Sequence, residues 1–566
     1  MAVSETALLD NTVPDVVDYK GRVVIRYKSG GWRSSGFIIG VEVAERFAYY
    51  GISLNLISFL TGPMGQSTAT AAENVNAWSG TASLLPLLGG FVADSFLGRF
   101  RTIVLASLLY VLGLCLLTLS ALLLASYGDS FHHSKSISTS HSPFQMVLFF
   151  FSLYLVAVAQ GGHKPCVQAF GADQFDGEDP VESKAKSSFF NWWYFGVCAG
   201  ALSTNLIVSY IQENVSWVIG FGIPCIVMVI ALIVFLLGTT TYRYTNIIPE
   251  KESPFVRIGR VFIAAIRNWR TAPSLALTTD QEESNGVELF NHQSSEQFKF
   301  LNKALLVPNG SKEEGKKYCS ISEVEEAKAV LRLVPIWGTC LAYAIVFAQT
   351  STLFTKQGAS MKRTIVPGLD LPAASLQSFI GIAIVLSIPI YDRILVPITR
   401  MFTRKPSGIT MLQRIGTGMI LSALSMVVAA VVEMKRLKIA KEYDLIDKKR
   451  DIPMSVWWLT PQYILIGMAD VFTMVGLQEF FYNQVPNELR SIGLALYHSI
   501  FGVGSFISSF LISTIDKATG GVGHDSWFSS NLNRGHLDYF YWLLAVLSAI
   551  GFAAYLYFAR SYIYKA

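Results

Sequence analysis

The chain alternates long apolar stretches with shorter polar ones, and the apolar stretches have the length of membrane-spanning helices. A spanning helix needs about 20 mostly apolar residues. Twelve stretches meet this requirement: 35–60, 74–97, 101–126, 144–169, 187–211, 215–238, 330–355, 372–397, 408–433, 455–482, 488–515 and 536–560. Connections within each group of six are mostly short, whereas a long polar segment separates the sixth stretch from the seventh. The pattern predicts an all-α membrane protein with twelve transmembrane helices in two six-helix halves, which is typical of secondary transporters.

The expected organisation follows from these limits. We predict a cytosolic tail (1–34), a six-helix bundle (35–238), a cytosolic linker (239–329), a second bundle (330–560) and a cytosolic C-terminus (561–566). Within the linker, 254–269 and 322–331 have helical patterns and 279–295 is loose. The first apolar run is too long and too polar for a cleaved signal, so we expect it to remain as the first span.

Basic residues indicate the orientation, because cytosolic loops are enriched in Lys and Arg. They place the tail, the linker and the second-to-third and eighth-to-ninth connections in the cytosol. Two loops oppose this assignment: 356–371 has three basic residues and 434–453 has seven. We keep twelve spans, because removing one would move other basic clusters to the outside.

The composition agrees with a polytopic membrane protein. Charged residues make up 15% of the chain against about 25% in soluble domains, and the mean hydropathy is +0.42. The net charge of +5 requires no nucleic-acid partner, because the basic residues lie mainly in the tail and loops. The six cysteines have no metal-ligand spacing and no paired framework, so we expect them to be unpaired.

The first span carries the most informative polar residues. Glu42, Glu45, Arg46 and Tyr49 fall at i, i+3, i+4 and i+7 and therefore form one stripe on a helix. A charged side chain costs roughly 2.5–3.5 kcal/mol in a bilayer centre, so these residues must face one another, another helix or a water-filled cavity. A protonatable stripe in a spanning helix is typical of transport, and we assign proton coupling to Glu42, Glu45 and Arg46.

Two further charges lie within predicted spans. Lys164, near the end of the fourth span, requires an anionic partner, and Glu42, Glu45 and Asp470 of the tenth span are the candidates. Alternatively, Lys164 extends its ammonium group towards the cytosolic edge, and Asp470 has a purely structural partner. We interpret the adjacent His163 as a packing or capping residue, with a proton relay as the alternative.

Candidate gating residues follow the second and eighth spans. Asp94 precedes Arg99 and Arg101, and a weaker copy of this pattern, Asp392 and Arg393, follows the eighth span. The repetition favours an internal duplication. We expect ion pairs that re-form as the halves move, with topology-setting charges as the simpler alternative.

Other polar residues are candidates for the lining of a cavity. These are Asn191 and Tyr194 of the fifth span and the polar end of the seventh span, which includes Gln349. The sequence has no Walker-type phosphate loop, no H-E-x-x-H and no G-x-S-x-G motif. We therefore expect no enzyme, no cofactor and no metal, and an ion gradient as the energy source.

These residues together resemble the plant nitrate/peptide transporter family, the proton-coupled oligopeptide transporters of the major facilitator superfamily. The resemblance extends from Asp18 to Tyr562, and the long linker fits the plant branch. It is carried by Glu42-x-x-Glu45-Arg46, by 90–99 (GFVADSFLGR), by 189–194 (FFNWWY) and by 478–491 (QEFFY, Pro486 and LRS).

The resemblance implies proton-driven symport on the major facilitator fold, with the first-helix carboxylates carrying or relaying the proton. It also implies that Arg46 and Lys164 hold the anionic end of the substrate or exchange salt bridges with the carboxylates. Two positions depart from the family. Asp470 stands where peptide-transporting relatives often have Glu, and Phe347 stands where the dual-affinity nitrate transporter has its nitrate-binding histidine. Phenylalanine has no hydrogen-bond donor for nitrate.

The sequence therefore predicts a proton-coupled symporter of a small solute: a di- or tripeptide, nitrate or a hormone-like organic anion. Expected partners are the substrate, protons and the lipid bilayer, and the oligomeric state is open. An uncoupled facilitator on an internal membrane and a substrate-sensing transporter or receptor remain as alternatives. A weak acidic dileucine pattern at 5–9 leaves the plasma membrane and the vacuolar membrane as comparable locations.

Overall fold

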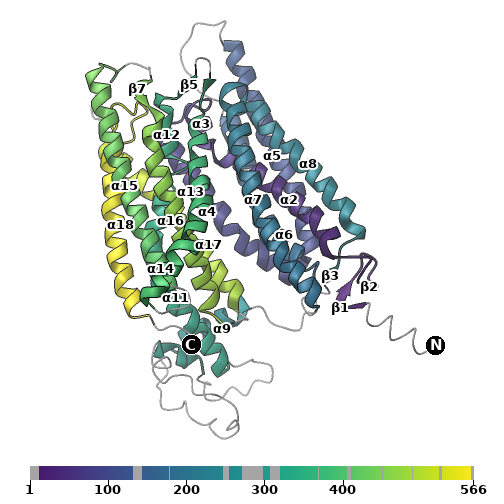
Figure 1. Ribbon diagram of the computed structural model, residues 1–566. Coiled ribbons are helices and arrows are strands. Elements are labelled where there is room, and N and C mark those ends of the chain that lie inside the picture. The colour runs from purple at the N-terminus through teal and green to yellow at the C-terminus, as the bar shows by residue number, and fades with distance from the viewer. Residues whose placement is uncertain are drawn as a thin grey trace, which may run out of the picture.

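The computed structural model describes residues 12–131, 143–176, 179–245, 254–269, 298–305, 319–366, 369–403, 409–447, 451–486, 489–521 and 525–562. In this part of the chain, two groups of long helices stand side by side, purple to blue and green to yellow in Figure 1. The first group contains α2 (Gly31–Ser53), α3 (Leu56–Thr61), α4 (Thr68–Val92), η1 (Ala93–Leu97), α5 (Arg99–Phe131), α6 (Pro143–Ala172), α7 (Pro180–Asn214), α8 (Trp217–Leu237) and η2 (Gly238–Thr240).

The second group begins after the linker. It contains α11 (Ile321–Phe347), α12 (Leu353–Ala359), η5 (Ala373–Gln377), α13 (Ser378–Ile390), η6 (Tyr391–Leu395), α14 (Val396–Thr403), α15 (Met411–Glu442), η7 (Val456–Leu459), α16 (Thr460–Asn483), α17 (Arg490–Thr519) and α18 (Leu537–Arg560). Short strands lie between some of these helices: β4 (Met361–Lys362) pairs with β7 (Ile452–Ser455), and β5 (Thr364–Val366) pairs with β6 (Leu369–Asp370).

Helices are present at all twelve predicted positions. Nine helices in the described part of the chain are long and apolar enough to cross a membrane, judged by length and composition. The helices at the other three positions are α2, α4 and α7. α2, for example, is not among the nine because it carries the charges of Glu42, Glu45 and Arg46 within its length. The count of twelve spans and the domain limits stay predictions.

The first and seventh helices are each interrupted near the end opposite to the linker. The gap between α2 and α3 lies at residues 54–55, and the gap between α11 and α12 at 348–352. At the second gap, Gln349 Nε2 donates to the carbonyl of Ile345 (2.8 Å) and Thr352 Oγ1 to that of Ala348 (2.8 Å). Side-chain bonds of this kind compete with the helical backbone pattern. The apolar pattern does not reveal these gaps.

A second feature is shared by the two halves. Helix α4 continues into the π-helical turn η1, and α13 continues into the π-helical turn η6. Each turn contains, as its second residue, the aspartate of the predicted gating pattern, Asp94 or Asp392. The matching position of two rare turns supports the internal duplication that the sequence suggested.

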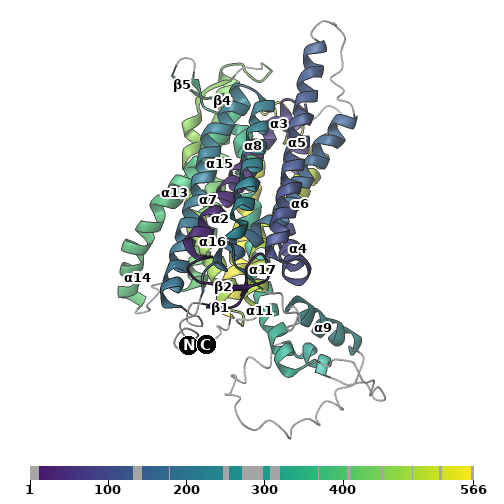
Figure 2. The ribbon, with the colours of Figure 1, turned by 90° about the vertical axis from the view of Figure 1, so that its right-hand side faces the viewer.

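A small layer covers the end of the bundle that positive charge assigns to the cytosol. Strands β1 (Thr12–Val17), β2 (Val23–Ile25) and β3 (Tyr244–Thr245) form a sheet in the order β2-β1-β3, beside the first half (Figure 2). Arg243, buried next to β3, donates to both carboxylate oxygens of Glu182 (2.6 and 3.1 Å) and to the carbonyl of Ser29. The tail, the linker and the start of α7 are thereby joined.

An N-terminal cap strengthens the same layer. Asp179 accepts hydrogen bonds from the backbone N–H groups of Glu182 and Val181, at the start of α7. These bonds, that from Glu182 first, and the charge of Arg26 hold the pKa of Asp179 below its usual value. Asp179 therefore remains charged at cytosolic pH and pairs with Arg26 at 2.6 Å.

The linker helix α9 (Pro254–Arg267) and the short helix η4 (Lys299–Leu305) pack on the start of α11. Arg257 pairs with Glu326 (3.2 Å) and Arg260 with Glu323 (3.5 Å). The helical patterns predicted at 254–269 and 322–331 are thus confirmed, whereas 279–295 lies outside the described residues.

The two halves are joined by polar contacts at the end opposite to the linker. Arg363 pairs with Glu213 (2.9 Å), and the half-buried ammonium group of Lys356 donates to Thr61 (2.9 Å). Further bonds run from Gln377 to the carbonyl of Leu54 (3.2 Å), from Asn76 to Ser508 (3.0 Å) and from Ser509 to the carbonyl of Glu73 (3.0 Å). The structure is therefore closed at this end.

The basic segment 434–453 is explained in part by the length of α15. This helix continues to Glu442, beyond the predicted end at 433. Arg436 is fully buried and donates to Glu433 (2.8 and 2.6 Å) and Asn533 (2.7 Å), and Lys435 lies 3.3 Å from the ring centre of Trp458. Arg436 is thus an internal ion-pair partner and not one of the solvated charges that determine topology.

Candidate functional site

Glu42, Glu45 and Arg46 form a buried ion-pair cluster on α2. The guanidinium Nε of Arg46 lies 2.6 Å from Glu45 Oε2 and 3.2 Å from Glu42 Oε1, and its Nη2 also contacts Glu45. Their exposed fractions are 3, 0 and 5%. The helical spacing places all three on one face, so the mutual contact expected from the sequence is present. One guanidinium neutralises one of the two negative charges and leaves the cluster short of one cation.

Tyrosines from two helices support the cluster. The hydroxyl of Tyr110 on α5 donates to Glu45 Oε1 (3.3 Å). Tyr49 lies one turn after Arg46, with its ring centre 5.6 Å from the guanidinium carbon, and it stacks on Trp78 of α4. Tyr49 is thus held beside the charged stripe, as predicted from its spacing. Tyr110 has no distinguishing sequence signal, because it lies in an otherwise apolar stretch.

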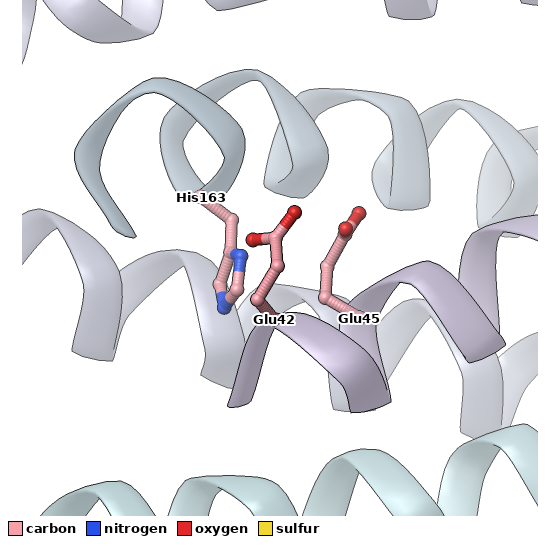
Figure 3. A group of neighbouring side chains, drawn as sticks. All are labelled: Glu42, Glu45 and His163. Atoms are coloured by element: carbon pink, nitrogen blue, oxygen red, sulfur yellow. The ribbon is translucent and has the colours of Figure 1, made fainter. Parts of the chain in front are cut away.

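Helix α6 brings Lys164 and His163 to the same place. Its glycines allow a close approach to α4: a Cβ atom added to Gly161 would lie 2.7 Å from Leu85 Cβ, and one added to Gly89 would lie 2.0 Å from the carbonyl oxygen of Gly161. Lys164 lies near enough for its charge to act on Glu42 and Glu45. It is therefore the second cation of the cluster. Figure 3 shows His163 beside the two carboxylates.

The same three side chains have a spacing that a metal ion would accept. Glu42, Glu45 and His163 each offer one ligand atom, and these atoms lie within 4.8 Å of one another. The electrostatics argue against a divalent cation, however, because Arg46 already contacts both carboxylates and Lys164 adds a second positive charge. A proton is the cation that fits beside two fixed positive charges.

Asp470 on α16 has a partner that the sequence did not indicate. The hydroxyl of Tyr343 on α11 donates a hydrogen bond to its carboxylate, and both side chains are buried. Within the described residues, Asp470 and Lys164 form no ion pair in this conformation, so the expected pairing is not present here. Tyr343 satisfies Asp470 within the second half, without requiring contact between the halves.

Phe347 and Gln349 follow Tyr343 on α11 and at its end. The ring of Phe347 contacts those of Tyr343 (6.4 Å) and Phe501 of α17 (5.6 Å), so it belongs to an aromatic cluster. Gln349 is fully buried, and its amide donates to Ser508 (2.8 Å), which also accepts a bond from Asn76. In this conformation Gln349 joins helices and does not line a vestibule, and its role in substrate binding stays a prediction.

His498 on α17 is a further residue that sequence reasoning missed. It lies near enough to Lys164 and Arg46 for their charges to act on it, although it belongs to the other half. Its ring packs on Tyr497 at 4.9 Å. A single histidine in an apolar stretch has no signal of its own, so only the fold identifies it as a neighbour of the cluster.

The remaining predicted residues are placed only in part. Arg99, at the start of α5, donates to Asp173 just after α6 (2.5 Å), which ties two cytosolic helix ends together. Arg101 and Arg393 are exposed. The side chains of Asp94, Asp392, Asn191 and Tyr194 lie outside the described part of the structure. Their gating and binding roles therefore stay predictions.

Comparison with known proteins identifies relatives over almost the whole chain. A family model described as "POT family" matches residues 100–528. Protein NRT1/PTR FAMILY 5.10 of Arabidopsis thaliana is 64% identical over 550 residues, which cover 97% of this chain and 96% of the relative. NRT1/PTR FAMILY 5.13 of the same plant is 59% identical over 564 residues, covering 99% and 98%.

Solved structures agree with this result at the level of the fold. The crystal structure of an auto-inhibited POT family peptide transporter superposes with a TM-score of 0.69 at 21% identity, covering 94% of this chain and 98% of that one. The transporter PepTSo gives a TM-score of 0.66 at 20% identity, with coverage of 94% and 98%. At these identities the likeness shows the fold alone.

Proposed function

This chain belongs to the POT family of multi-pass membrane transporters, and we propose that it is a symporter that carries a small anion together with protons. The observation that carries the proposal is the buried cluster of Glu42, Glu45 and Arg46 with Lys164 within electrostatic reach. A carboxylate beside a fixed cation stays ionised, and it binds a proton more readily when a compensating cation is drawn away.

This relation links proton binding to substrate binding. An anion that engages Lys164 withdraws positive charge from the two carboxylates, which then bind a proton more tightly. By the reciprocity of linked equilibria, proton binding promotes anion binding to the same extent. An inward proton gradient would drive anion uptake by this coupling.

The charges around the cluster favour an anionic solute. Arg46 and Lys164 of the first half bear positive charge, and their charges act as far as His498 of the second half. Asp470, the acidic group of the second half, is engaged by Tyr343. This engagement argues against the amine of a peptide as the main contact in this conformation.

The aromatic cluster favours an organic anion over nitrate. Tyr343, Phe347, Tyr497 and Phe501 form a continuous series of ring contacts on α11 and α17. Such a surface binds an apolar body, and Phe347 offers no donor to nitrate. We therefore propose a carboxylate with an aromatic or otherwise apolar body as the preferred substrate, ahead of nitrate and peptides.

The test is substrate-evoked current and uptake in oocytes at external pH 5.5 and 7.5, with nitrate, dialanine and indole-3-acetate as probes. Benzenesulfonate, which stays ionised at both pH values, controls for passive entry of a protonated weak acid. We expect inward current that is larger at pH 5.5, with the organic anion giving the largest response. If the oocyte surface gives no signal, vacuolar membrane vesicles are tested in the same way.

Two other results would support the alternative functions. Uptake that ignores pH would indicate a facilitator in which Glu42, Glu45 and Arg46 form a structural ion-pair cluster. Specific binding of a probe without flux in either membrane would indicate a sensor. Either result would contradict proton symport.

A further inference from the structure

His163 is buried without a hydrogen-bonding partner beside the carboxylates. Its exposed fraction is 0%, and within the described residues neither Nδ1 nor Nε2 has a hydrogen-bond partner. One of its nitrogens lies within 4.8 Å of a carboxylate oxygen of both Glu42 and Glu45 (Figure 3). Buried polar atoms without partners are rare in folded proteins and need an explanation. The interpretation of His163 as a packing or capping residue does not supply one.

The surroundings of His163 contain few other charged groups. Helix α2 contributes Glu42, Glu45 and Arg46, and α6 itself contributes Lys164. The ring of Tyr110 on α5 meets His163 edge-on at 6.4 Å. From α4, Leu85, Gly89 and Gly90 lie against this part of α6, and none of them carries a charge. Candidates for electrostatic interaction with the imidazole are therefore the members of the cluster.

The charges of the cluster balance with two cations and not with three. Two carboxylates are offset by Arg46, which is always charged, and by one further cation. Both Lys164 and a protonated His163 can supply that cation, because both lie beside the carboxylates. A third positive charge in this buried site would be repelled by the other two. Lys164 and the imidazolium therefore compete for one position.

We propose that His163 is a third proton-binding side chain of the coupling cluster, which takes up a proton when an anionic substrate draws Lys164 away from Glu42 and Glu45. The proposal rests on the proposed symport and deepens it. The step adds one proton to an imidazole nitrogen and changes no other bond. Anion binding and proton uptake then become linked through an imidazole, the side chain whose unperturbed pKa lies nearest to physiological pH.

A titration without substrate tests the competition directly. Lys164→Met removes the competing cation, so the purified full-length protein in nanodiscs should take up about one more proton than wild type between pH 8 and pH 5. The gain should disappear in the double variant Lys164→Met/His163→Gln. Lys356→Met, which removes a half-buried lysine at the end opposite to the linker, is the matched control and should show no gain. A gain that persists in the double variant would place the proton on a carboxylate and overturn the proposal.

A transport measurement separates this inference from the proposed function. In proteoliposomes, the ratio of uptake at pH 5.5 to uptake at pH 7.5 is measured with nitrate, dialanine and indole-3-acetate. For the probe that wild type accumulates, His163→Gln should lower the ratio by about threefold or more, whereas Val167→Ala, a buried change on the same helix, should preserve it. If acid stimulates uptake by the wild type and His163→Gln has the same ratio of uptake at pH 5.5 to uptake at pH 7.5, only the role of His163 is overturned. A wild type without acid stimulation for any probe would overturn the symport proposal, and the role of His163 with it.

Discussion

The hydroxyl of Tyr343 on α11 donates a hydrogen bond to the carboxylate of Asp470 on α16, in the interior of the second half. A carboxylate buried in a membrane protein needs such a partner, because water is not available to solvate it. The bond means that Asp470 does not depend on Lys164 in this conformation, which is closed at the end opposite to the linker. The bond occupies Oδ1 of Asp470 and leaves the second carboxylate oxygen for a cation such as Lys164 in another conformation.

Tyr343→Phe removes this donor while keeping the ring that packs on Phe347 and Phe501. We expect a loss of about 1.5–3 kcal/mol of stability, typical of a hydrogen bond to a charged group, seen as a lower midpoint of thermal unfolding in detergent. In a protein that already carries Asp470→Asn, Tyr343→Phe should cost less stability. The double variant should therefore lose less stability than the two single variants lose together. Strict additivity would contradict a direct Tyr343–Asp470 interaction.

The ion pair between Arg363 and Glu213 should hold the two halves together at the end opposite to the linker. Arg363→Ala should raise the rate at which an impermeant maleimide labels Thr61→Cys, by about threefold or more, because one of the bonds between the halves is lost. The charge swap Arg363→Glu/Glu213→Arg should return the rate towards the original value. Lys438→Ala removes a solvent-exposed pair with Glu442 and serves as a control without effect. Equal rates in all variants would show that this ion pair does not contribute to closure.

The cytosolic layer makes a prediction about stability. Gly30 has a φ of 77°, and a Cβ atom at this position would lie 2.1 Å from Arg243 Nε. Gly30→Ala should therefore displace Arg243 from Glu182 and Ser29 and cost about 1–3 kcal/mol, measured as a lower thermal midpoint. Gly36→Ala is the matched control, because no atom lies within 4 Å of its added Cβ. Equal midpoints for the two variants would indicate that the layer does not stabilise the bundle.

The sequence was informative where function depends on near neighbours along one helix. Glu42, Glu45 and Arg46 lie within five consecutive positions, so the helical repeat alone brings them together, and the structure gives distances of 2.6 and 3.2 Å from Arg46 to the two acids. The helices also occupy the predicted positions, because apolar length is a strong signal.

Contacts between residues far apart in the sequence could not be predicted from the helical repeat. Tyr343 and Asp470 are 127 positions apart, and the charge of Lys164 acts on His498 of the other half. The end of α15 was placed too early, because its last turns are polar and only a fold that buries Arg436 against Glu433 explains them. These relationships depend on how helices pack, which the hydrophobic pattern of one chain does not specify.

Proton coupling through Glu45 is the central claim, and Glu45→Gln tests it most directly. Glutamine keeps the size and the acceptor oxygen of the side chain but carries no titratable proton. The measurement is the reversal potential of substrate-evoked current in oocytes at external pH 5.5 and 7.5, for the probe that gives the largest wild-type response. In a symporter this potential depends on the proton gradient, so we expect it to shift with external pH in the wild type. In Glu45→Gln we expect accumulation and proton-dependent current to be lost. A variant that still accumulates substrate with the wild-type pH dependence would contradict the account.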